Sequence, residues 1–451
     1  MDIIAGMLIT FCVLIFSIYK GIFVGYPLLM GFLIFSYISL RRGFSLSEIL
    51  IMSYTGGKKA FVVLKIFVLI GAITAIWMAA GTVPGIVYYG IKFMNPNFFI
   101  LYTFLISSLV SFLLGTSLGT VSTVGLALIV MAKSGNVDPN IAAGAIIAGA
   151  YFGDRCSPMS SSANLVANLT ETNLYINIRN MFKTSIIPLL LSMVLYTIIS
   201  FQQPLSFIGS SIDNEIVKIF TINWYVLLPS LIIIVLSILK VNVKLSMLFS
   251  ILAASIISVS LQQQTLPQIL RYMLLGFHLD SASPLYTIIK GGGIVSMWKA
   301  SLVVFVSCSL AGVFDGTNML KSVENILMKA KTRFQLFSYT TGVSILTAAF
   351  GCNQSIAAVL TNQLMTNTYK EKNVDKYALA IDLENTGIVL AALIPWNIAA
   401  FVPTSTMNVS SIGFIPYAFY LYLLPIVNII YFKISETSYK VRPISSYNSK
   451  C

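Results

Sequence analysis

Charged residues are scarce in this chain of 451 residues. Asp, Glu, Lys and Arg make up only 10% of it, hydrophobic residues make up 57%, and the mean hydropathy is +0.88. This balance excludes an ordinary soluble globular protein. Apolar runs of roughly 17–25 residues, long enough to cross a bilayer as helices, recur along the chain, whereas the alternating stretches of a membrane barrel do not. The composition predicts an all-α, polytopic membrane protein built as a helical bundle.

Cysteine and histidine are also scarce. The five cysteines have no paired spacing, which excludes a disulfide framework or a zinc site. The single histidine, His278, could relay protons, but it lies beside Asp280 and Pro284 and is more simply read as solvated. The motifs HExxH, GxSxG, the P-loop and paired CxxC are missing. We therefore expect no enzyme, no resident metal and no cofactor.

Acidic residues are outnumbered, with 15 Asp and Glu against 28 Lys and Arg, a net charge of +13. The basic residues fall mostly in short segments, of which the best cytoplasmic candidates are the loops 41–59 and 321–333. The positive-inside rule explains such clusters, and the aromatic interleaving of a nucleic-acid groove is missing. The charge therefore predicts membrane topology and not a nucleic-acid partner.

Several apolar segments are interrupted near their middle. The interruptions lie at 115–120, 153–158, 351–355 and 384–397. Broken segments at corresponding places in two halves indicate a secondary transporter with inverted repeats and broken or re-entrant helices at a midplane site. We expect one transporter domain over 1–451 with a first repeat, connecting spans, a second repeat and a disordered tail, at about 60–200, 202–268, 290–432 and 436–451, respectively. Helical spans are expected near 3–19, 21–40, 60–80, 98–133, 140–169, 184–200, 222–239, 244–260, 292–314, 335–368, 378–406 and 413–432.

The stretch Gly149–Asn164 places a carboxylate, Asp154, at bilayer depth, where it costs about 2.5–3.5 kcal/mol. Pro158 removes a backbone donor, so the helix is expected to open here and free carbonyl oxygens. Serine and asparagine oxygens follow, and hard cations prefer this mixture of ligands. The alternative is a helix cap in which Asp154 pairs with Arg155, but adjacent helical residues do not face each other. We interpret the stretch as an ion site.

The second acidic break holds two carboxylates, Asp382 and Glu384. Because they are two residues apart, they should point to different sides of a helix. Glu384, next to Asn385, is the preferred functional acid, and the alternative is a structural pair with Lys376. The other two breaks offer neutral oxygen donors that could equally serve close helix packing: Thr116, Ser117 and Thr120 in the first half, and Asn353 and Ser355 in the second.

Four motifs in this order resemble the NhaC family of sodium/proton antiporters. They are Gly149–Pro158 with Asn164-Leu165, the Gly115–Thr120 break, the Gly351–Gln354 break, and Glu384–Thr386 with Ile394–Asn397. The resemblance covers about 60–432 and implies the fold of the ion-transporter superfamily. It also implies exchange of sodium for protons, with organic acids exchanged in some branches. Carried over by residue, it implies a first-half site of Asp154, Ser157, Asn164 and Thr120, and a second-half site of Asn353, Glu384, Asn385 and Asn397. The family usually carries an aspartate where this chain has Ser161, which leaves the stoichiometry and the substrate open.

The expected function is exchange of cytoplasmic Na⁺ for external protons, which compete for a buried carboxylate, in a multi-pass protein of the cell membrane. The rival is an exchanger, or Na⁺-coupled carrier, of a small organic acid or amino acid. In that case Arg155, Thr116 and Ser117 would hold the substrate carboxylate and Ser161 would make room for it. A third reading is a sensor that does not transport. The expected partners are Na⁺, protons and the lipid bilayer, and a homodimer is one assembly that the sequence permits.

Overall fold

The computed structural model describes residues 2–206, 212–239, 241–280, 283, 285–286, 289–317 and 327–438. Within these ranges the chain is almost entirely helical. The first half consists of α1 (Asp2–Tyr19), α2 (Gly25–Arg41), α3 (Leu46–Ala79), α4 (Thr82–Phe93), η1 (Pro96–Phe98), α5 (Phe99–Leu114), α6 (Ser117–Thr120), the π-helical η2 (Val121–Gly125), α7 (Leu126–Ser134), α8 (Pro139–Cys156), α9 (Ser161–Leu169) and α10 (Leu174–Gln202).

The middle of the chain forms two apolar helices, α12 and α13, followed by a short helix and a β-hairpin. It consists of α11 (Ile212–Ile219), η3 (Trp224–Leu227), α12 (Leu228–Ile238), α13 (Val243–Ser260), α14 (Leu266–Leu275) and the antiparallel strands β1 (Phe277–His278) and β2 (Lys290–Gly291). The segment 262–290, which the sequence left undecided, thus contains a helix and a hairpin.

The second half repeats the pattern of long and interrupted helices. It consists of η4 (Ile294–Met297), α15 (Trp298–Gly316), α17 (Arg333–Gly351), α18 (Gln354–Glu371), α19 (Lys376–Leu383), the π-helical η6 (Glu384–Ile388), η7 (Ala391–Leu393), α20 (Ile398–Met407), η8 (Ile415–Tyr417) and α21 (Phe419–Ser438). Of the predicted tail, residues 436–438 belong to α21, and 439–451 lie outside the described residues.

Four helices in the described part of the chain are long and apolar enough to cross a membrane: Pro96–Leu114, Ser117–Ser134, Leu174–Gln202 and Ile294–Gly316. Two bent pairs could form further spans. Leu64–Ala79 and Thr82–Phe93 meet at 62°, and Lys376–Leu393 and Ile398–Met407 meet at 46°. The expected multi-pass helical membrane bundle is confirmed. The sequence predicted the second bend but not the first, which lies at Gly81 with a φ of +77°.

Helix α3 starts earlier than expected. Ser45 caps it, since the Ser45 hydroxyl accepts from the backbone N–H of Glu48 at 3.2 Å and the Glu48 carboxylate accepts from the N–H of Ser45 at 2.7 Å. The expected loop at 41–59 is therefore wrong over most of its length, because residues from Leu46 onward are helical. Its basic pair, Lys58-Lys59, lies on the fourth turn of α3.

Glycines bring the central helices of the first half together. A Cβ atom on Gly149 would lie 2.4 Å from the carbonyl oxygen of Phe104, and one on Gly153 would lie 2.2 Å from that of Ser108. Only hydrogen fits at these positions, so α8 packs directly against the backbone of α5. This contact fixes the end of α8, where Asp154 lies, relative to the end of α5.

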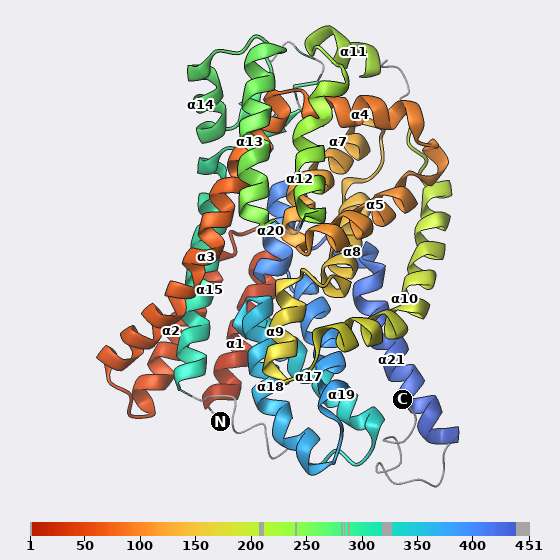
Figure 1. The fold of residues 1–451 in the computed structure, drawn as a ribbon. Helices are drawn as coiled ribbons and strands as arrows, with labels where there is room; N and C mark the ends of the chain where they lie inside the picture. The colour runs from red at the N-terminus through yellow and green to blue at the C-terminus, as the bar shows by residue number, and fades with distance from the viewer. Residues whose placement is uncertain are drawn as a thin grey trace.

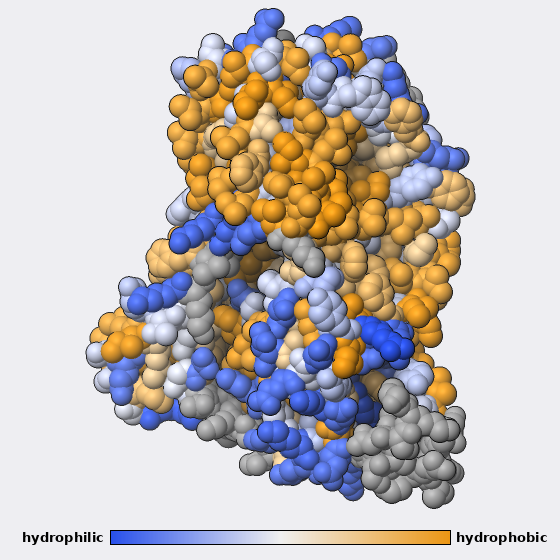
Figure 2. All heavy atoms as spheres, in the orientation of Figure 1, coloured by the Kyte–Doolittle hydropathy of each residue, from blue (hydrophilic) through white to orange (hydrophobic). Residues whose placement is uncertain are grey.

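The two ends of the bundle differ in what they carry. The start of α1 and the end of α21 lie toward the end that holds α18 and α19, while α11 and α14 lie at the opposite end (Figure 1). Apolar side chains cover the face formed by α12 and α13, where Leu231, Val235, Leu248, Phe249 and Leu252 are exposed (Figure 2). A band of exposed apolar side chains on a helical bundle matches a surface that faces lipid.

Candidate ion-binding site

In the first half, the interruption after α5 lies against the interruption after α8, and we call this contact the first-half crossing. Gly115 ends α5 in the left-handed conformation, with a φ of +64°, which glycine adopts at no steric cost. A Cβ at Gly115 would lie 2.6 Å from the carbonyl carbon of Met159, in the turn between α8 and α9. The break after α5 therefore lies directly against the break after α8. Both breaks were predicted from the sequence, but their contact was not.

Asp154 lies at this crossing, in the last turn of α8, and is 6% exposed. Its Oδ2 accepts a hydrogen bond from the backbone N–H of Ser117, the first residue of α6, at 3.1 Å. Its Oδ1 has no hydrogen-bond partner among the described residues. One oxygen of the carboxylate is thus held by the opposite break, and the other is left available.

A second crossing lies in the other half. Cys352 ends α17 with a φ of +50°, and its carbonyl oxygen accepts from the backbone N–H of Ile398 at 2.9 Å. Asn397 donates from Nδ2 to the carbonyl of Ala348 at 2.7 Å, and the indole of Trp396 donates to the carbonyl of Ala349 at 2.7 Å. The break before α20 is thus tied to the end of α17. Each half contains one such crossed pair.

Glu384 opens the π-helical turn η6 and is completely buried. Neither oxygen of its carboxylate has a hydrogen-bond partner among the described residues. Asp382, two residues earlier, makes an ion pair with Arg333 at 2.6 Å and accepts from the hydroxyl of Tyr369. The prediction that the two acids point to different sides is confirmed. The alternative pairing of Glu384 with Lys376 is wrong, because the Lys376 ammonium donates to the carbonyl of Glu171 at 2.7 Å.

Arg155 is completely buried and connects several helices. Its guanidinium donates to Ser185 at 2.6 Å and Thr184 at 3.4 Å on α10, to Tyr420 at 2.7 Å on α21, and to the side-chain oxygen of Asn385 on η6. It makes no ion pair with Asp154, as predicted from their adjacent positions. Arg155 also interacts electrostatically with Glu384. The guanidinium of Arg155, in the first half, therefore contacts the turn η6 in the second half, which begins with Glu384.

Unpaired buried polar atoms concentrate at these residues. Among the described residues, fifteen buried side-chain nitrogen or oxygen atoms have no hydrogen-bond partner, and five of them belong to the four residues just described. They are Oδ1 of Asp154, Nε of Arg155, both carboxylate oxygens of Glu384, and Nδ2 of Asn385. Most buried polar groups in proteins are satisfied. This concentration indicates a place where a ligand, an ion or water completes the bonding.

Most of the other predicted site residues make local helix caps. Thr116, Asn353 and Asn397 accept from backbone N–H groups at the starts of α6, α18 and α20, respectively. The hydroxyl of Ser157 accepts from the N–H of Met159 at 3.2 Å, and that of Thr120 donates to the carbonyl of Thr116 at 2.9 Å. Ion binding by these residues stays a prediction.

Asn164 and Ser161 lie on α9 and are exposed. The Asn164 amide donates to the carbonyl of Ser160 at 2.7 Å. The Asn164 amide also lies 3.4 Å from the carbonyl oxygen of Pro158, so it bonds back to the turn between α8 and α9. Sequence reasoning missed Ser185 and Tyr420, which hold Arg155. Ser185 follows Thr184 at the start of an apolar run and could have been noticed, whereas Tyr420 carries no local signal.

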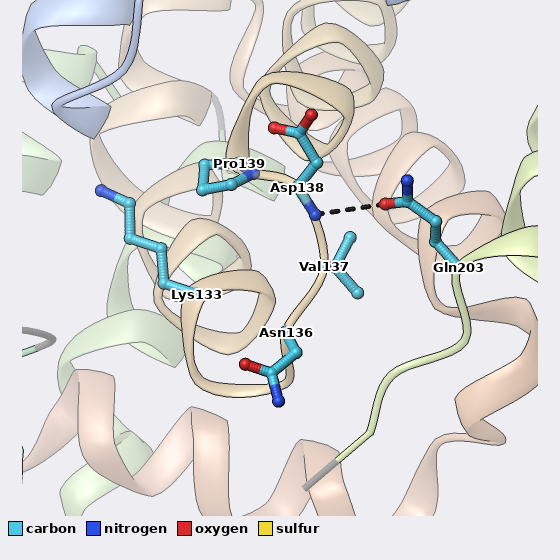
Figure 3. A pocket seen from close by; sticks show the side chains of 6 residues that line it. All are labelled: Lys133, Asn136, Val137, Asp138, Pro139 and Gln203. Carbon is cyan, nitrogen blue, oxygen red and sulfur yellow. Dashed lines mark hydrogen bonds between the residues drawn. The ribbon is translucent and has the colours of Figure 1, made fainter. Parts of the chain in front are cut away.

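The described residues contain no group of three or more His, Cys, Asp or Glu side chains that could hold a metal. The candidate site instead contains two carboxylates and one guanidinium, those of Asp154, Glu384 and Arg155. Two cavities lie elsewhere. One, of about 450 Å³, lies at the turn between α7 and α8, where the backbone N–H of Asp138 donates to Gln203 at 3.3 Å (Figure 3). The second, of about 400 Å³, shares Lys133 with it.

The sequence of this chain is similar to those of known antiporters. A family model described as the Na⁺/H⁺ antiporter family matches residues 149–434. The Na(+)/H(+) antiporter NhaC of Alkalihalophilus pseudofirmus is 28% identical over 378 residues, 81% of this chain and 80% of the relative. The Malate-2H(+)/Na(+)-lactate antiporter of Bacillus subtilis is 27% identical over 415 residues, 90% of this chain and 88% of the relative. The Arginine/ornithine antiporter ArcD of Halobacterium salinarum is 26% identical over 379 residues, 82% and 77% of the two chains.

Proposed function

The chain belongs to the Na⁺/H⁺ antiporter family, and on this premise we propose that Na⁺ and protons compete for the buried carboxylates of Asp154 and Glu384. The family is one of secondary antiporters and not of enzymes. The direction of exchange that we propose is export of cytoplasmic Na⁺ against entry of external protons, across the cell membrane. No resident cofactor is needed, because the transported cations themselves complete the site.

The observation that carries this proposal is the set of unpaired oxygens on two buried acids. Oδ1 of Asp154 and both oxygens of Glu384 accept no hydrogen bond from the described residues. A carboxylate oxygen buried without a partner is unfavourable unless a proton or a cation binds it. Either cation would satisfy these oxygens, and hydroxyl and backbone oxygens suit Na⁺ as further ligands.

Charge counting limits how many cations the site takes. Asp154 and Glu384 contribute two negative charges, and Arg155 contributes one positive charge without leaving its hydroxyl and amide partners. One negative charge remains in excess. A single Na⁺ or a single proton neutralises it, so each loaded state is neutral and the empty state is not. The conformational change that moves the site from one side of the membrane to the other costs less energy when the cluster is neutral than when it is charged. The loaded states therefore switch sides more readily than the empty state, which favours exchange over leakage.

The crossed breaks support alternating access. The first-half break holds Asp154 through Ser117, and the second-half break is held by Asn397 and Cys352. The proposed inverted-repeat relation between the halves would let one crossing open as the other closes. In this scheme Thr120, Ser157 and Asn385 are further candidate ligands, while Asn164, Asn353 and Asn397 act through the helix ends that they hold.

A second candidate function is exchange of a small organic acid or amino acid. The unpaired Nε of Arg155 and Nδ2 of Asn385 are donors, which a cation does not satisfy but a carboxylate would. The printed names of two relatives include malate, lactate, arginine and ornithine.

The test is dye-reported proton flux in proteoliposomes that carry an imposed pH gradient. If the proposal is right, NaCl dissipates the gradient, and the apparent KM for Na⁺ rises about tenfold for each unit of pH decrease in the range where the proton fills the site. An apparent KM that does not change with pH would contradict competition. Flux that requires lactate, malate, arginine or ornithine would support the second candidate instead.

A further inference from the structure

The second cavity lies between the two halves, at the end of the bundle opposite α18 and α19. Its volume is about 400 Å³, within the range of small-molecule sites. Helix α7 forms one wall, the end of α20 another, and the β1–β2 hairpin with the glycines that follow it a third. Figure 1 places the neighbouring helices α7 and α14 at that end.

Basic side chains line this cavity, and acidic ones do not. Lys133, His278 and Lys290 are among its lining residues, which include no Asp or Glu. Lys133 donates from Nζ to the carbonyl oxygens of Met407 at 2.9 Å and Asn408 at 3.2 Å on the same wall, and Lys290 is exposed. The ion pairs found within the described residues, Lys218–Glu215 and Arg333–Asp382, involve neither lysine. A wall with basic and without acidic side chains attracts an anion.

A buried hydroxyl in the same cavity has no partner. Thr74 lines the cavity, is only 2% exposed, and its hydroxyl makes no hydrogen bond with the described residues. Two other lining hydroxyls are bonded, since Ser296 donates to the carbonyl of Gly293 at 2.7 Å and Thr406 to that of Val402 at 2.9 Å. An unpaired buried donor on a cavity wall is a place for a ligand acceptor.

The wall beside Thr74 is built into the fold. A Cβ on Gly292 would lie 2.4 Å from the backbone nitrogen of Ala75, and the N–H of Gly293 donates to the carbonyl of Gly71 at 2.7 Å. Gly292 and Gly293 both have positive φ, at +71° and +88°. Larger side chains could not bring this loop so close to α3. This packing fixes the loop after β2 against α3 at the wall that carries Thr74.

We propose that this cavity binds a small organic carboxylate, with Lys290 and the Thr74 hydroxyl donating to its oxygens and Lys133 adding positive charge from its place on the wall. The remaining wall is apolar, with Met78, Ile129 and Phe277 among its residues. Such a wall favours an anion with a short apolar or hydroxylated body over chloride or phosphate, which gain nothing from apolar contact.

The cavity lies on the same helical run as the first-half crossing. Leu126 lines it, and the same helix continues backward through η2 to Thr120 and the first-half crossing. Six helical residues span about 9 Å. The inference goes beyond the proposed cation exchange and does not depend on it, because none of the lining residues belongs to the Asp154–Glu384 cluster.

The experiment measures equilibrium binding of radiolabelled lactate to the full chain in lipid nanodiscs. We expect saturable binding that malate competes for and that equal chloride or phosphate does not. Lys290→Gln should weaken binding about tenfold, through loss of a charged partner, and Thr74→Val about fivefold, through loss of one hydrogen bond. Lys299→Gln, an exposed lysine on α15 outside the cavity, serves as the matched charge control and should bind as the wild type does.

Retained Na⁺-dependent proton flux in the same preparations shows that each variant is folded. Asp154→Asn should keep lactate binding, which separates this site from the ion site. Absence of saturable lactate binding, equal competition by chloride or phosphate, or unchanged binding in both Lys290→Gln and Thr74→Val would overturn the inference. If the wild-type protein binds lactate but shows no Na⁺-dependent proton flux, the carboxylate site in the cavity is supported and the proposed cation exchange is refuted.

Discussion

Arg155 donates to the side-chain oxygen of Asn385 and makes no hydrogen bond with the adjacent carboxylate of Glu384, although the two charges interact. The cation is thereby close enough to balance the acid and yet leaves both oxygens of Glu384 open. A direct bidentate ion pair would occupy the carboxylate, as Arg333 occupies Asp382. The difference between these two arginines separates the candidate site from the structural ion pair.

Neutral replacement of either unpaired acid should abolish exchange. We expect Asp154→Asn and Glu384→Gln each to lower Na⁺-dependent proton flux at least about 100-fold, because each removes a charged ligand worth about 3 kcal/mol. The measurement is the dye assay in proteoliposomes. Glu371→Gln, an exposed acid at the end of α18, is the control and should keep full flux. Normal flux in Glu384→Gln would remove that residue from the site.

Loss of the guanidinium should leave two buried negative charges without compensation. We expect Arg155→Gln to hold protons more tightly, so that the pH of half-maximal Na⁺ exchange moves toward the alkaline side by about one unit or more. Arg155→Lys keeps the charge and should restore the position of the pH profile. It should still lower the maximal rate, because an ammonium cannot reach Ser185, Tyr420 and Asn385 together. An identical pH profile in all three proteins would refute a balancing role.

One excess negative charge in the cluster predicts electroneutral exchange of one Na⁺ for one proton. A valinomycin-imposed potassium potential of about 100 mV should leave the rate of Na⁺-dependent proton flux unchanged within about twofold. Net movement of one charge per cycle would add about 2.3 kcal/mol at that voltage and change the flux far more than this. A strong voltage dependence would show that a second proton binds, and the charge count would then be wrong.

The ion pair of Asp382 with Arg333 should contribute to the stability of the fold. Asp382 is 1% exposed and also accepts from Tyr369, while Arg333 lies 4.3 Å from the ring centroid of Phe432. Arg333→Met alone leaves a buried charge unpaired and should lower the free energy of unfolding by about 3–5 kcal/mol. The double variant Arg333→Met with Asp382→Leu should lose much less. Thermal unfolding in detergent compares them, and equal losses in the single and double variants would argue against a buried pair.

The sequence alone determined the class of the protein and the places where its helices break. Hydropathy predicts membrane helices because lipid offers backbone groups no hydrogen bonds, and the local chemistry of Gly115 and Pro158 predicts interruptions without any knowledge of the partner helix. The spacing of Asp382 and Glu384 likewise sufficed to predict that they point apart. These conclusions rest on interactions between near neighbours in the chain.

Only the tertiary structure decided which polar groups have hydrogen-bond partners and which have none. Asn353 and Asn397 contain the right oxygens for a cation, yet each caps a helix, and Asn164 and Ser161 are exposed on α9. The partners of Arg155 come from α10, α21 and η6, and the cavity wall at Thr74 depends on glycines more than 200 residues away. Hydrogen-bond satisfaction depends on contacts between distant segments, so no local pattern in the sequence could reveal it.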